Sequence, residues 1–320
     1  METRTLGTSS LRVSVVGLGC NNLGRPGTRT QTQDGATEVV RAALDAGVTL
    51  FDTADIYGTE YGLSERLLGE ALRGRRDEAI IATKFGHQDY ASPFAELGPR
   101  GGRRYLRAAV DASLSRLQTD HIDLYQLHTP DPETPIGETL QALDELVREG
   151  KVLAIGHSNL DATQLRDADD AAHDLGTARF VSAQNEYSLL ERQVEAELLP
   201  AVRERGLGFL PYFPLANGLF TGKFGRSQRP ADTRIARQRP HIADNAPWDA
   251  IEAFERFAAA RAIGILEATF GWFLSRPEVS SVIAGATRPE QITANAAAGS
   301  GWRPSAEEVA TIDALFPRDA

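Results

Sequence analysis

Short apolar runs alternate with amphipathic stretches along most of the chain. Eight runs are almost continuously apolar, which is typical of strands buried on both faces of a parallel sheet. They cover residues 13–19, 48–52, 79–84, 122–128, 152–158, 179–184, 207–213 and 279–285. Between them lie stretches with helical spacing, such as 35–47, 105–118 and 136–151. Eight strands with intervening helices predict an α/β protein with a closed (β/α)8 barrel of the TIM type.

A doubly wound open sheet is the alternative fold. Residues 17–24, GLGCNNLG, are superficially similar to a dinucleotide-binding fingerprint, but no clear helix follows them.

Two further segments fit the barrel. Residues 4–14 predict a small hairpin that would plug the N-terminal mouth, and residues 214–248, after the seventh strand, form a segment too long for an ordinary connection. Such a loop is usually a lid, a binding loop or disordered.

Composition narrows the class of protein. The chain has 320 residues and no internal repeat or linker, so we expect one domain over residues 1–320. Its net charge of −10 argues against nucleic-acid or anionic-membrane partners, since both require a basic face. A single cysteine, Cys20, allows no internal disulfide, and no Cys/His cluster has the spacing of zinc ligands. No apolar run resembles a signal core or a membrane span, so we expect a cytoplasmic protein.

Ionisable residues stand at the ends of three consecutive predicted strands. Asp52 ends the second strand with Tyr57 five residues later, Lys84 ends the third, and His128 ends the fourth. One such residue alone could simply meet solvent at a strand end. Because active sites of these barrels lie at the carboxyl ends of the strands, the four together predict a site at one mouth.

Four motifs carry a family resemblance. The runs F-D-T-A-x-x-Y-G (51–58), T-K (83–84), H-x-P-D (128–131) and G-x-S-N (156–159) occur in the order found in the aldo-keto reductase superfamily. The chain resembles that superfamily from about residue 4 to residue 316. The resemblance implies that Asp52, Tyr57, Lys84 and His128 form a catalytic tetrad, and that a small-molecule carbonyl is reduced with NADPH.

The chemistry of these side chains agrees with those roles. A reduced carbonyl oxygen needs a proton, and a tyrosine hydroxyl, with an ordinary pKa of about 10, holds its proton too tightly near neutrality. A nearby ammonium favours the phenolate, so Lys84 is expected to lower the pKa of Tyr57, while Asp52 keeps Lys84 charged. A neutral His128 can donate a hydrogen bond to the same oxygen. The alternative is an Asp52–Lys84 ion pair that only stabilises the barrel mouth.

The later strand ends match the cofactor side of the family. By resemblance, Ser158, Asn159 and Gln184 bind the nicotinamide carboxamide, and Tyr212 stacks on the ring, as suits a planar heterocycle. By the same resemblance, the pyrophosphate is wrapped by Leu215, Asn217, Gly218 and Lys223. Taken singly, these polar residues could merely satisfy backbone groups at strand ends, and Tyr212 could belong to the core.

The segment after the eighth strand suggests the form of the cofactor. Residues 285–295 match the family pattern G-x-x-x-P-E-Q-x-x-x-N, which by resemblance binds the 2′-phosphate and adenine of NADPH, with Gly285, Gln291 and Asn295 at cofactor-binding positions. The guanidinium of Arg288, within this segment, suits phosphate. Thr287 and Glu290 have the spacing of a capping box, with Pro289 in the first turn. A helix N-terminus there would favour phosphate binding. The alternative is a solvated arginine on an ordinary helix.

Two other functions remain open. Some proteins of this superfamily keep the tetrad but act as slow, cofactor-sensing regulatory subunits. A barrel isomerase or lyase using Lys84 as a Schiff base is disfavoured, because the cofactor-matching residues would then have no purpose.

His157 is expected to pack between strand and helix, because strand alternation turns its side chain away from that of Ser158. Substrate choice would depend on residues 85–103, 129–137, 214–248 and the C-terminal end, which specify neither a substrate nor an oligomeric state.

Overall fold

Eight parallel strands form one sheet in the computed structural model, which describes residues 1–231 and 233–318. The strands pair in the order β10-β3-β4-β5-β6-β7-β8-β9. Their bounds are β3 Val16–Gly19, β4 Leu50–Asp52, β5 Ile80–Phe85, β6 Ile122–Leu127, β7 Val152–Ser158, β8 Phe180–Gln184, β9 Gly208–Phe209 and β10 Val282–Gly285. All eight predicted strands are therefore present.

Backbone hydrogen bonds close the sheet into a barrel. Phe209 of β9 pairs with Val279, just ahead of β10. The Phe209 N–H donates to the Glu278 carbonyl at 2.7 Å, and the Ser280 N–H donates to the Phe209 carbonyl at 3.0 Å. The predicted (β/α)8 barrel is confirmed. A doubly wound sheet is excluded, because each strand pairs with its sequence neighbours all the way round.

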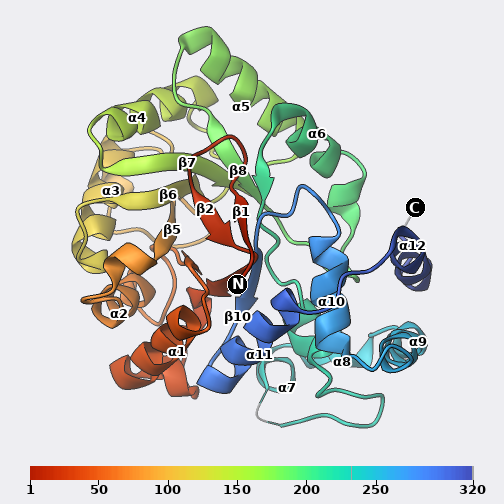
Figure 1. The fold of residues 1–320 in the computed structure, drawn as a ribbon. Helices are drawn as coiled ribbons and strands as arrows, with labels where there is room; N and C mark the ends of the chain where they lie inside the picture. Colours follow the sequence, from red (N-terminus) through yellow and green to blue (C-terminus); the bar gives the residue numbers. More distant parts are fainter. Residues whose placement is uncertain (232, 319–320) are drawn as a thin grey trace.

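Helices surround the barrel on its outer side (Figure 1). Most are amphipathic and pack their apolar side on the outward-facing residues of the strands, whereas the helix Ile265–Leu274 is buried over almost its whole surface. Following the strands in order they are α1 Gln33–Asp45, α2 Leu63–Ala71, α3 Arg103–Leu117, α4 Ile136–Arg148, α5 Ala162–Leu175, α6 Leu198–Arg205, α10 Ile265–Leu274 and α11 Pro289–Ser300. This layer places every strand's carboxyl end at one open mouth.

The predicted hairpin plugs the opposite end of the barrel. Strands β1 Thr3–Thr5 and β2 Arg12–Ser14 pair antiparallel and lie across the centre of the barrel in Figure 1. Their side chains form an apolar cluster with the barrel interior; it contains Leu6, Leu11, Val13, Leu50, Ala82, Leu124, Ala154, Leu210 and Ile283. Gly7, at φ +54°, is required at the turn, because a Cβ there would lie 2.2 Å from the Val181 carbonyl oxygen.

Two predicted segments differ in detail from the structure. The first apolar run, 13–19, is divided, because Val13 and Ser14 belong to the hairpin and β3 begins at Val16. The long segment 214–248 is not a bare loop. It contains a 3-10 helix, Ala216–Thr221, and two short helices, α7 Arg234–Gln238 and α8 Pro240–Asp244, before α9 Trp248–Ala259 begins. Asp232, in this segment, and residues 319–320 lie outside the described residues.

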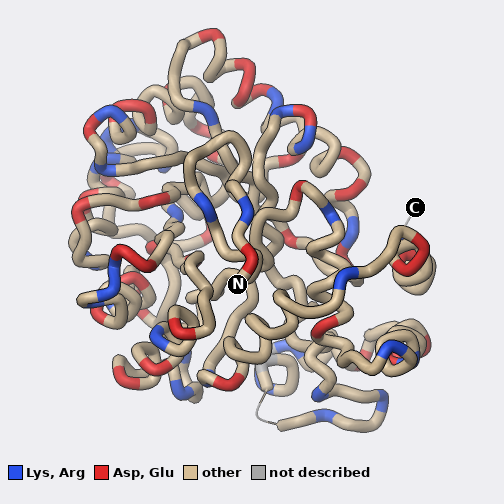
Figure 2. The backbone as a smooth tube through the Cα atoms, viewed as in Figure 1, with Lys and Arg blue, Asp and Glu red and all other residues tan. Residues whose placement is uncertain are grey.

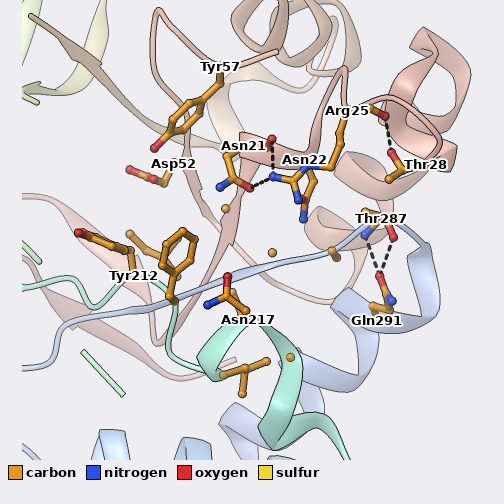
Figure 3. A pocket seen from close by; sticks show the side chains of 18 of the residues that line it. Asn21, Asn22, Arg25, Thr28, Asp52, Tyr57, Tyr212, Asn217, Thr287 and Gln291 are labelled. Carbon is orange, nitrogen blue, oxygen red and sulfur yellow. Dashed lines mark hydrogen bonds between the residues drawn. The ribbon is translucent and has the colours of Figure 1, made fainter. Parts of the chain in front are cut away.

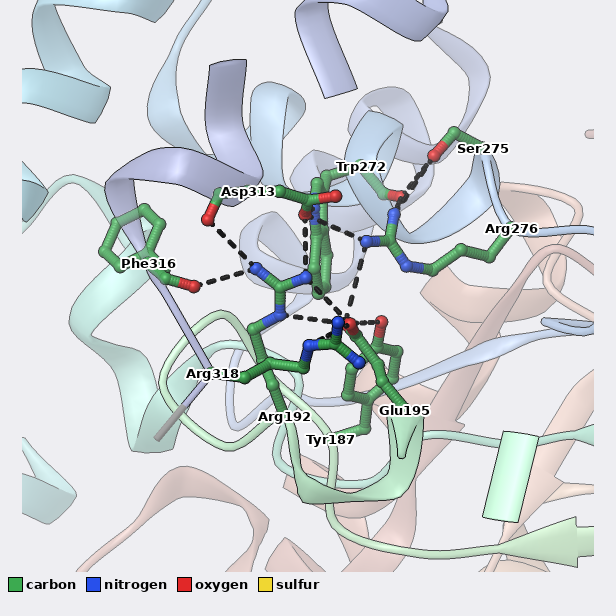
Figure 4. A network of polar contacts seen from close by, with 9 residues as sticks. All are labelled: Tyr187, Arg192, Glu195, Trp272, Ser275, Arg276, Asp313, Phe316 and Arg318. Atoms are coloured by element: carbon green, nitrogen blue, oxygen red, sulfur yellow. Dashed lines mark hydrogen bonds and ion pairs between the residues drawn. The ribbon is translucent and has the colours of Figure 1, made fainter. Parts of the chain in front are cut away.

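A network of charged side chains holds the last helix, α12 Ala306–Leu315, against the barrel (Figure 4). The buried Arg192 donates from Nη1 to the Phe316 carbonyl at 2.7 Å and pairs with Glu195 at 2.7 Å. Asp313 of α12 accepts from the Trp272 indole at 2.8 Å and from Arg276 at 3.0 Å. These bonds join α12 to α10 and to the segment after β8.

Charges of both signs are interspersed over the outer helices in the view of Figure 2. Many of them pair, as in the exposed contacts of Arg107 with Glu145 and Glu149. Within residues 1–231 and 233–318, no helix has the length and apolar character needed to cross a bilayer.

Candidate active site

A cavity of about 1200 Å³ opens at the carboxyl ends of the strands. Pockets for one small molecule usually occupy about 300–1000 Å³, so this space suits a cofactor together with a small substrate. Of the sixteen site residues that the sequence predicted, fourteen line it: Asp52, Tyr57, His128, Ser158, Asn159, Gln184, Tyr212, Leu215, Asn217, Gly218, Lys223, Gly285, Arg288 and Gln291. Lys84 is fully buried against Asp52, and Asn295 is buried within α11.

Strand alternation explains why the polar residues meet inside the barrel. Leu50, Ala82 and Leu124 face the interior within the apolar cluster beside the hairpin. Two residues further along the same strands stand Asp52, Lys84 and Gln126, which a period of two turns to the same side. The barrel interior therefore changes from an apolar layer below to a polar layer at the mouth.

Lys84 and Asp52 form the central contact of this polar layer. The Lys84 ammonium donates to both Asp52 carboxylate oxygens, at 2.9 and 2.8 Å, and to the Thr53 carbonyl at 2.9 Å. Burial acts to lower the pKa of Lys84, but Asp52 and Tyr57 outweigh it and the pKa is raised. Lys84 is therefore a charged ammonium in a fixed position.

Tyr57 lies over this pair, as Figure 3 shows for Tyr57 and Asp52. The Lys84 nitrogen is 5.1 Å from the centre of the Tyr57 ring. Desolvation raises the pKa of Tyr57, and the Lys84 ammonium lowers it without reversing the shift. The sequence predicted the effect of Lys84 but not the net direction, because the extent of desolvation depends on the assembled cavity.

His128 is a neutral imidazole beside Tyr57. Its ring meets the Tyr57 ring edge-on, with 5.9 Å between their centroids. Burial lowers the pKa of His128 well below its ordinary value, and Lys84 and His87 add to the shift. Its Nδ1 is buried and has no hydrogen-bond partner among the described residues. A neutral ring carries one N–H donor, as the predicted role requires.

Two glutamines complete the surroundings of Asp52. The Gln184 amide nitrogen donates to Asp52 Oδ1 at 2.9 Å, and the Gln126 amide nitrogen lies 3.5 Å from the same oxygen. The sequence assigned Gln184 to a nicotinamide, and in the structure its nitrogen already binds the carboxylate. Gln126 was missed, although its place near the end of the strand that leads to His128 was a usable signal.

Ser158, Asn159 and Tyr212 form a chain of hydrogen bonds across the cavity wall. Ser158 donates to the Gln184 carbonyl at 2.9 Å, and the Asn159 amide nitrogen donates to the His128 carbonyl at 2.9 Å. The Tyr212 hydroxyl donates to Asn159 Oδ1 at 2.9 Å, which fixes the tilt of the Tyr212 ring at the cavity. Burial raises the pKa of Tyr212 to about 12, so this hydroxyl keeps its proton.

The segment after β9 follows an unusual backbone path. Phe213, Ala216 and Asn217 have φ values of +52°, +45° and +59°, in the left-handed region that costs energy for residues other than glycine. Asn217 points toward the cavity in Figure 3, and its Oδ1 is buried without a partner in the part of the chain that the structure describes. This path presents Asn217 to the cavity at the cost of a strained backbone, as often occurs at ligand-binding sites.

The N-terminus of α11 lies at the far end of the cavity, beside Thr287 and Gln291 in Figure 3. The predicted capping box between Thr287 and Glu290 is wrong. The N-cap residue is Arg288, so the third helical position is Gln291. Its Oε1 accepts the Thr287 N–H at 2.7 Å.

Several lining residues were missed by the sequence reasoning. Asn21 and Asn22 follow β3 at the same mouth, so their position after a strand end could have identified them. Gly285 allows Asn22 to approach, because a Cβ at Gly285 would lie 2.6 Å from the Asn22 amide nitrogen. Arg25 and His87 lie in irregular loops, where no sequence period shows which side chains face the cavity.

The cavity is far more basic than the chain as a whole. Among its described lining residues only Asp52 and Glu290 are acidic, whereas six are cationic: Arg25, Arg29, Lys223, Arg237, Arg239 and Arg288. Burial and the charge of Arg239 both lower the pKa of Arg25. Concentrating like charges costs energy, and an anionic ligand would recover that cost.

His157 points away from the cavity, as its place in the strand predicted. It is fully buried and packs against Phe180, with 5.3 Å between ring centroids. Burial alone lowers the pKa of His157 to about 3, and neither ring nitrogen has a partner among the described residues. His157 is therefore a packed, neutral histidine.

Comparisons with known proteins match nearly the whole chain. The sequence profile described as the aldo/keto reductase family matches residues 15–316. L-glyceraldehyde 3-phosphate reductase of Escherichia coli strain K12 is 32% identical over 98% of this chain and 92% of its own. Aldo-keto reductase YhdN of Bacillus subtilis is 34% identical over 99% of this chain and 94% of its own. A probable voltage-gated potassium channel subunit beta of Oryza sativa is 32% identical over 92% of this chain and 90% of its own.

Proposed function

The chain belongs to the aldo/keto reductase family, and on that premise we propose that it reduces aldehyde or ketone carbonyls to alcohols with NADPH. One observation carries the proposal above the others. A charged Lys84, a protonated Tyr57 and a neutral His128 adjoin the same end of a cavity whose other end is basic. This arrangement suits a reaction in which a carbonyl oxygen takes up a proton beside an anionic cofactor.

The residues of the cavity fit NADPH. The six cationic side chains that line the cavity suit a ligand that carries several negative charges. Ser158, Asn159 and Gln184 would hold the nicotinamide amide, with Tyr212 against the ring. Leu215, Asn217, Gly218 and Lys223 would hold the pyrophosphate, and Gly285, Arg288, Gln291 and Asn295 the adenosine 2′-phosphate end. When bound, NADPH supplies a hydride.

Tyr57 provides the proton in this proposal. The carbonyl carbon gains the hydride, and the oxygen gains the Tyr57 hydroxyl proton, so the product is a neutral alcohol. The ammonium of Lys84, kept charged by Asp52, stabilises the phenolate that Tyr57 becomes. Burial raises the pKa of Tyr57, so the hydroxyl is protonated before the reaction. It would release its proton only when negative charge develops on the carbonyl oxygen of the substrate.

His128 orients the substrate. Because its pKa lies well below its ordinary value, the ring stays neutral and donates one hydrogen bond to the carbonyl oxygen. Two donors, from Tyr57 and His128, then fix the direction of the carbonyl. The raised pKa of Lys84, held by Asp52 and Tyr57, argues against a Schiff-base enzyme, because a Schiff base forms from the neutral amine.

A second candidate is a cofactor-sensing regulatory subunit with little turnover. The name of the Oryza sativa relative, probable voltage-gated potassium channel subunit beta, favours it. Such a subunit would bind NADPH as tightly as an enzyme but would oxidise it slowly with every carbonyl offered. Turnover numbers, measured beside cofactor affinity, therefore separate the two functions.

The deciding experiment compares Tyr57→Phe with the wild type by NADPH absorbance over a panel of aldehydes and ketones. We expect NADPH binding to persist and carbonyl reduction to fall by at least about 10²-fold, a general-acid contribution. Tyr125→Phe is the matched control, because its hydroxyl is buried without a described partner away from the cavity lining. Equal rates for Tyr57→Phe and wild type would overturn the assignment of the proton donor.

A further inference from the structure

A buried carboxyl group lies close to the site in sequence but takes no part in the proposed reaction. Asp55 follows β4, three residues after Asp52 and two before Tyr57, and its side chain is fully buried. Its Oδ2 accepts a hydrogen bond from the Tyr61 hydroxyl, and its Oδ1 has no partner among the described residues. Asp55 does not line the cavity, so any effect on the reaction must pass through other residues.

The bonds of Asp55 close the loop that carries Tyr57. Along the backbone, the Asp55 N–H donates to the Lys84 carbonyl at 3.2 Å, and the Gly62 N–H donates to the Asp55 carbonyl at 2.6 Å. Beside this backbone closure, the side chain of Asp55 binds that of Tyr61. Tyr57 lies on the short stretch between the two closing ends. The path of this stretch, and with it the position of the Tyr57 ring, therefore depends on Asp55.

Tyr61 is held in turn by side chains outside the loop. The Arg116 guanidinium of α3 lies 5.2 Å from the centre of the Tyr61 ring, and Phe94 meets the ring edge-on, with 6.1 Å between centroids. Gly62 allows Arg116 to approach, because a Cβ at Gly62 would overlap the Arg116 Cδ. The Tyr61 hydroxyl is therefore a donor in a fixed place, and its bond ties the loop to α3.

The surroundings of Asp55 make its carboxyl group easy to replace by an amide. Burial raises the pKa of Asp55 to about 7, and the charge of the buried Glu65 on α2 adds to the shift. The other ionisable side chains near the carboxyl group are Tyr61, Tyr105, Arg116 and Tyr125. At pH 6 most molecules therefore contain a neutral Asp55, which asparagine matches in shape and charge.

We propose that Asp55 is a positioning residue, which through its bond to Tyr61 holds the Tyr57 hydroxyl where the carbonyl oxygen of the substrate binds. A displacement of about 1 Å in a reacting group can lower a rate about 10²-fold, so the loss of this bond should appear in kcat. The residues assigned to NADPH follow other strands, so the affinity for NADPH should not change. This inference rests on the proposed function for its reaction but concerns residues that contact neither substrate nor cofactor.

The test compares Tyr61→Phe with the wild type at pH 6, using the aldehyde or ketone that the wild type reduces fastest. The variant removes only the hydroxyl that binds Asp55. We expect kcat to fall about tenfold, part of the loss that a full displacement of the Tyr57 hydroxyl would cause. KM and NADPH affinity should stay close to those of the wild type.

Three further variants test whether the two side chains act as one unit. Asp55→Ala should reproduce the loss in kcat, and the double variant with Tyr61→Phe should be no slower than either single variant. Asp55→Asn keeps an oxygen that accepts from Tyr61 and should retain most of the wild-type kcat. Additive losses in the double variant, or an Asp55→Asn variant as slow as Asp55→Ala, would contradict the proposal.

Tyr187→Phe is the matched control, because the Tyr187 hydroxyl also binds a carboxylate, that of Glu195 at 2.7 Å, outside the cavity lining (Figure 4). It should lower stability but leave kcat unchanged.

The outcomes separate this inference from the proposed function. If the wild type reduces carbonyl compounds and Tyr61→Phe does so at the same rate, the inference is wrong and the reductase function stands. Tyr61→Phe and Asp55→Ala variants that do not fold, or that lose NADPH affinity in step with kcat, would mark the bond as structural and overturn the inference. A wild type that binds NADPH but reduces no carbonyl compound would overturn the proposed function and the inference with it.

Discussion

The Lys84 ammonium contacts both carboxylate oxygens of Asp52, at 2.9 and 2.8 Å, and both side chains are buried. The pair brings no net charge into the barrel, and each partner alone would be an uncompensated charge. Its two possible roles, in catalysis and in stability, can therefore be separated by removing one partner or both.

Lys84→Met should abolish carbonyl reduction at every accessible pH, because no ammonium remains to stabilise the Tyr57 phenolate. It should also lower the free energy of unfolding by about 3–5 kcal/mol, since the Asp52 carboxylate is left buried and unpaired. The double variant Asp52→Asn with Lys84→Met should recover stability without activity. A double variant with substantial turnover would show that the ion pair only stabilises the barrel mouth.

Arg288→Ala should weaken NADPH binding roughly ten- to a hundredfold and leave NADH binding nearly unchanged. The reason is that NADH lacks the 2′-phosphate that Arg288 and the first turn of α11 would bind. The wild-type preference for NADPH should decline as salt is added. Fluorescence titrations of both cofactors measure these affinities.

The matched control for Arg288 is Arg226→Ala, an exposed arginine paired with Glu252 outside the cavity lining. It should change neither affinity. Equal losses for NADPH and NADH in Arg288→Ala, or a wild-type preference for NADH, would contradict the assignment.

His157 should make the protein less stable in mild acid. The pKa of His157 is about 3 in the folded chain, against an ordinary value of 6.5. Between these two pH values, His157 is protonated in the unfolded chain but neutral in the folded chain. The contribution of His157 to the free energy of unfolding is therefore fully present above pH 6.5. It falls by about 1.4 kcal/mol for each pH unit as the pH drops from 6.5 toward 3. His157→Leu should remove this part of the loss, because both ring nitrogens lack described partners.

Urea unfolding at pH 7 and pH 5 measures the effect of His157→Leu. The variant should match the wild type at pH 7 and exceed it at pH 5. His173→Leu, at an exposed position on α5, serves as the control and should leave the pH dependence as it is. Parallel pH profiles for the wild type and His157→Leu would refute the prediction.

Arg192→Met should loosen the C-terminal helix. The substitution keeps an apolar stem but removes the bonds to the Phe316 carbonyl and to Glu195. Breaking a buried ion pair lowers the free energy of unfolding by about 3–5 kcal/mol. Because Arg276 also lies near Glu195 and keeps that carboxylate partly paired, we expect a value near the lower end of this range. We expect a lower urea midpoint and faster proteolysis within α12. Unchanged proteolysis would show that the apolar contacts of Phe316 anchor the helix alone.

The sequence predicted best what strand periodicity controls. Asp52, Lys84 and His128 lie at or next to the carboxyl ends of apolar strands, so their convergence followed from the parallel order alone. Residues such as Arg25 and His87 depend on the path of an irregular loop, and no local pattern specifies that path. The capping box failed by one residue, because Arg288 rather than Thr287 ends the extended backbone.

Charge effects were harder to predict than positions. The direction of the Tyr57 shift depends on the balance between burial and the Lys84 ammonium, and only the assembled cavity determines how much water reaches the hydroxyl. The basic lining of the cavity could not be predicted from composition either. The chain has a net charge of −10, and composition does not show that six cationic side chains lie at one mouth of the barrel.

The amino terminus, which leads into the hairpin, lies at the end of the barrel opposite the cavity. Met1 adjoins Gly47, between α1 and β4, and Ser300 at the end of α11, so the amino terminus emerges on the side remote from the cavity. A dye, a bead or a second protein joined ahead of Met1 would leave the mouth facing free solution. Immobilised in that orientation, every molecule on a surface would present its cavity outward.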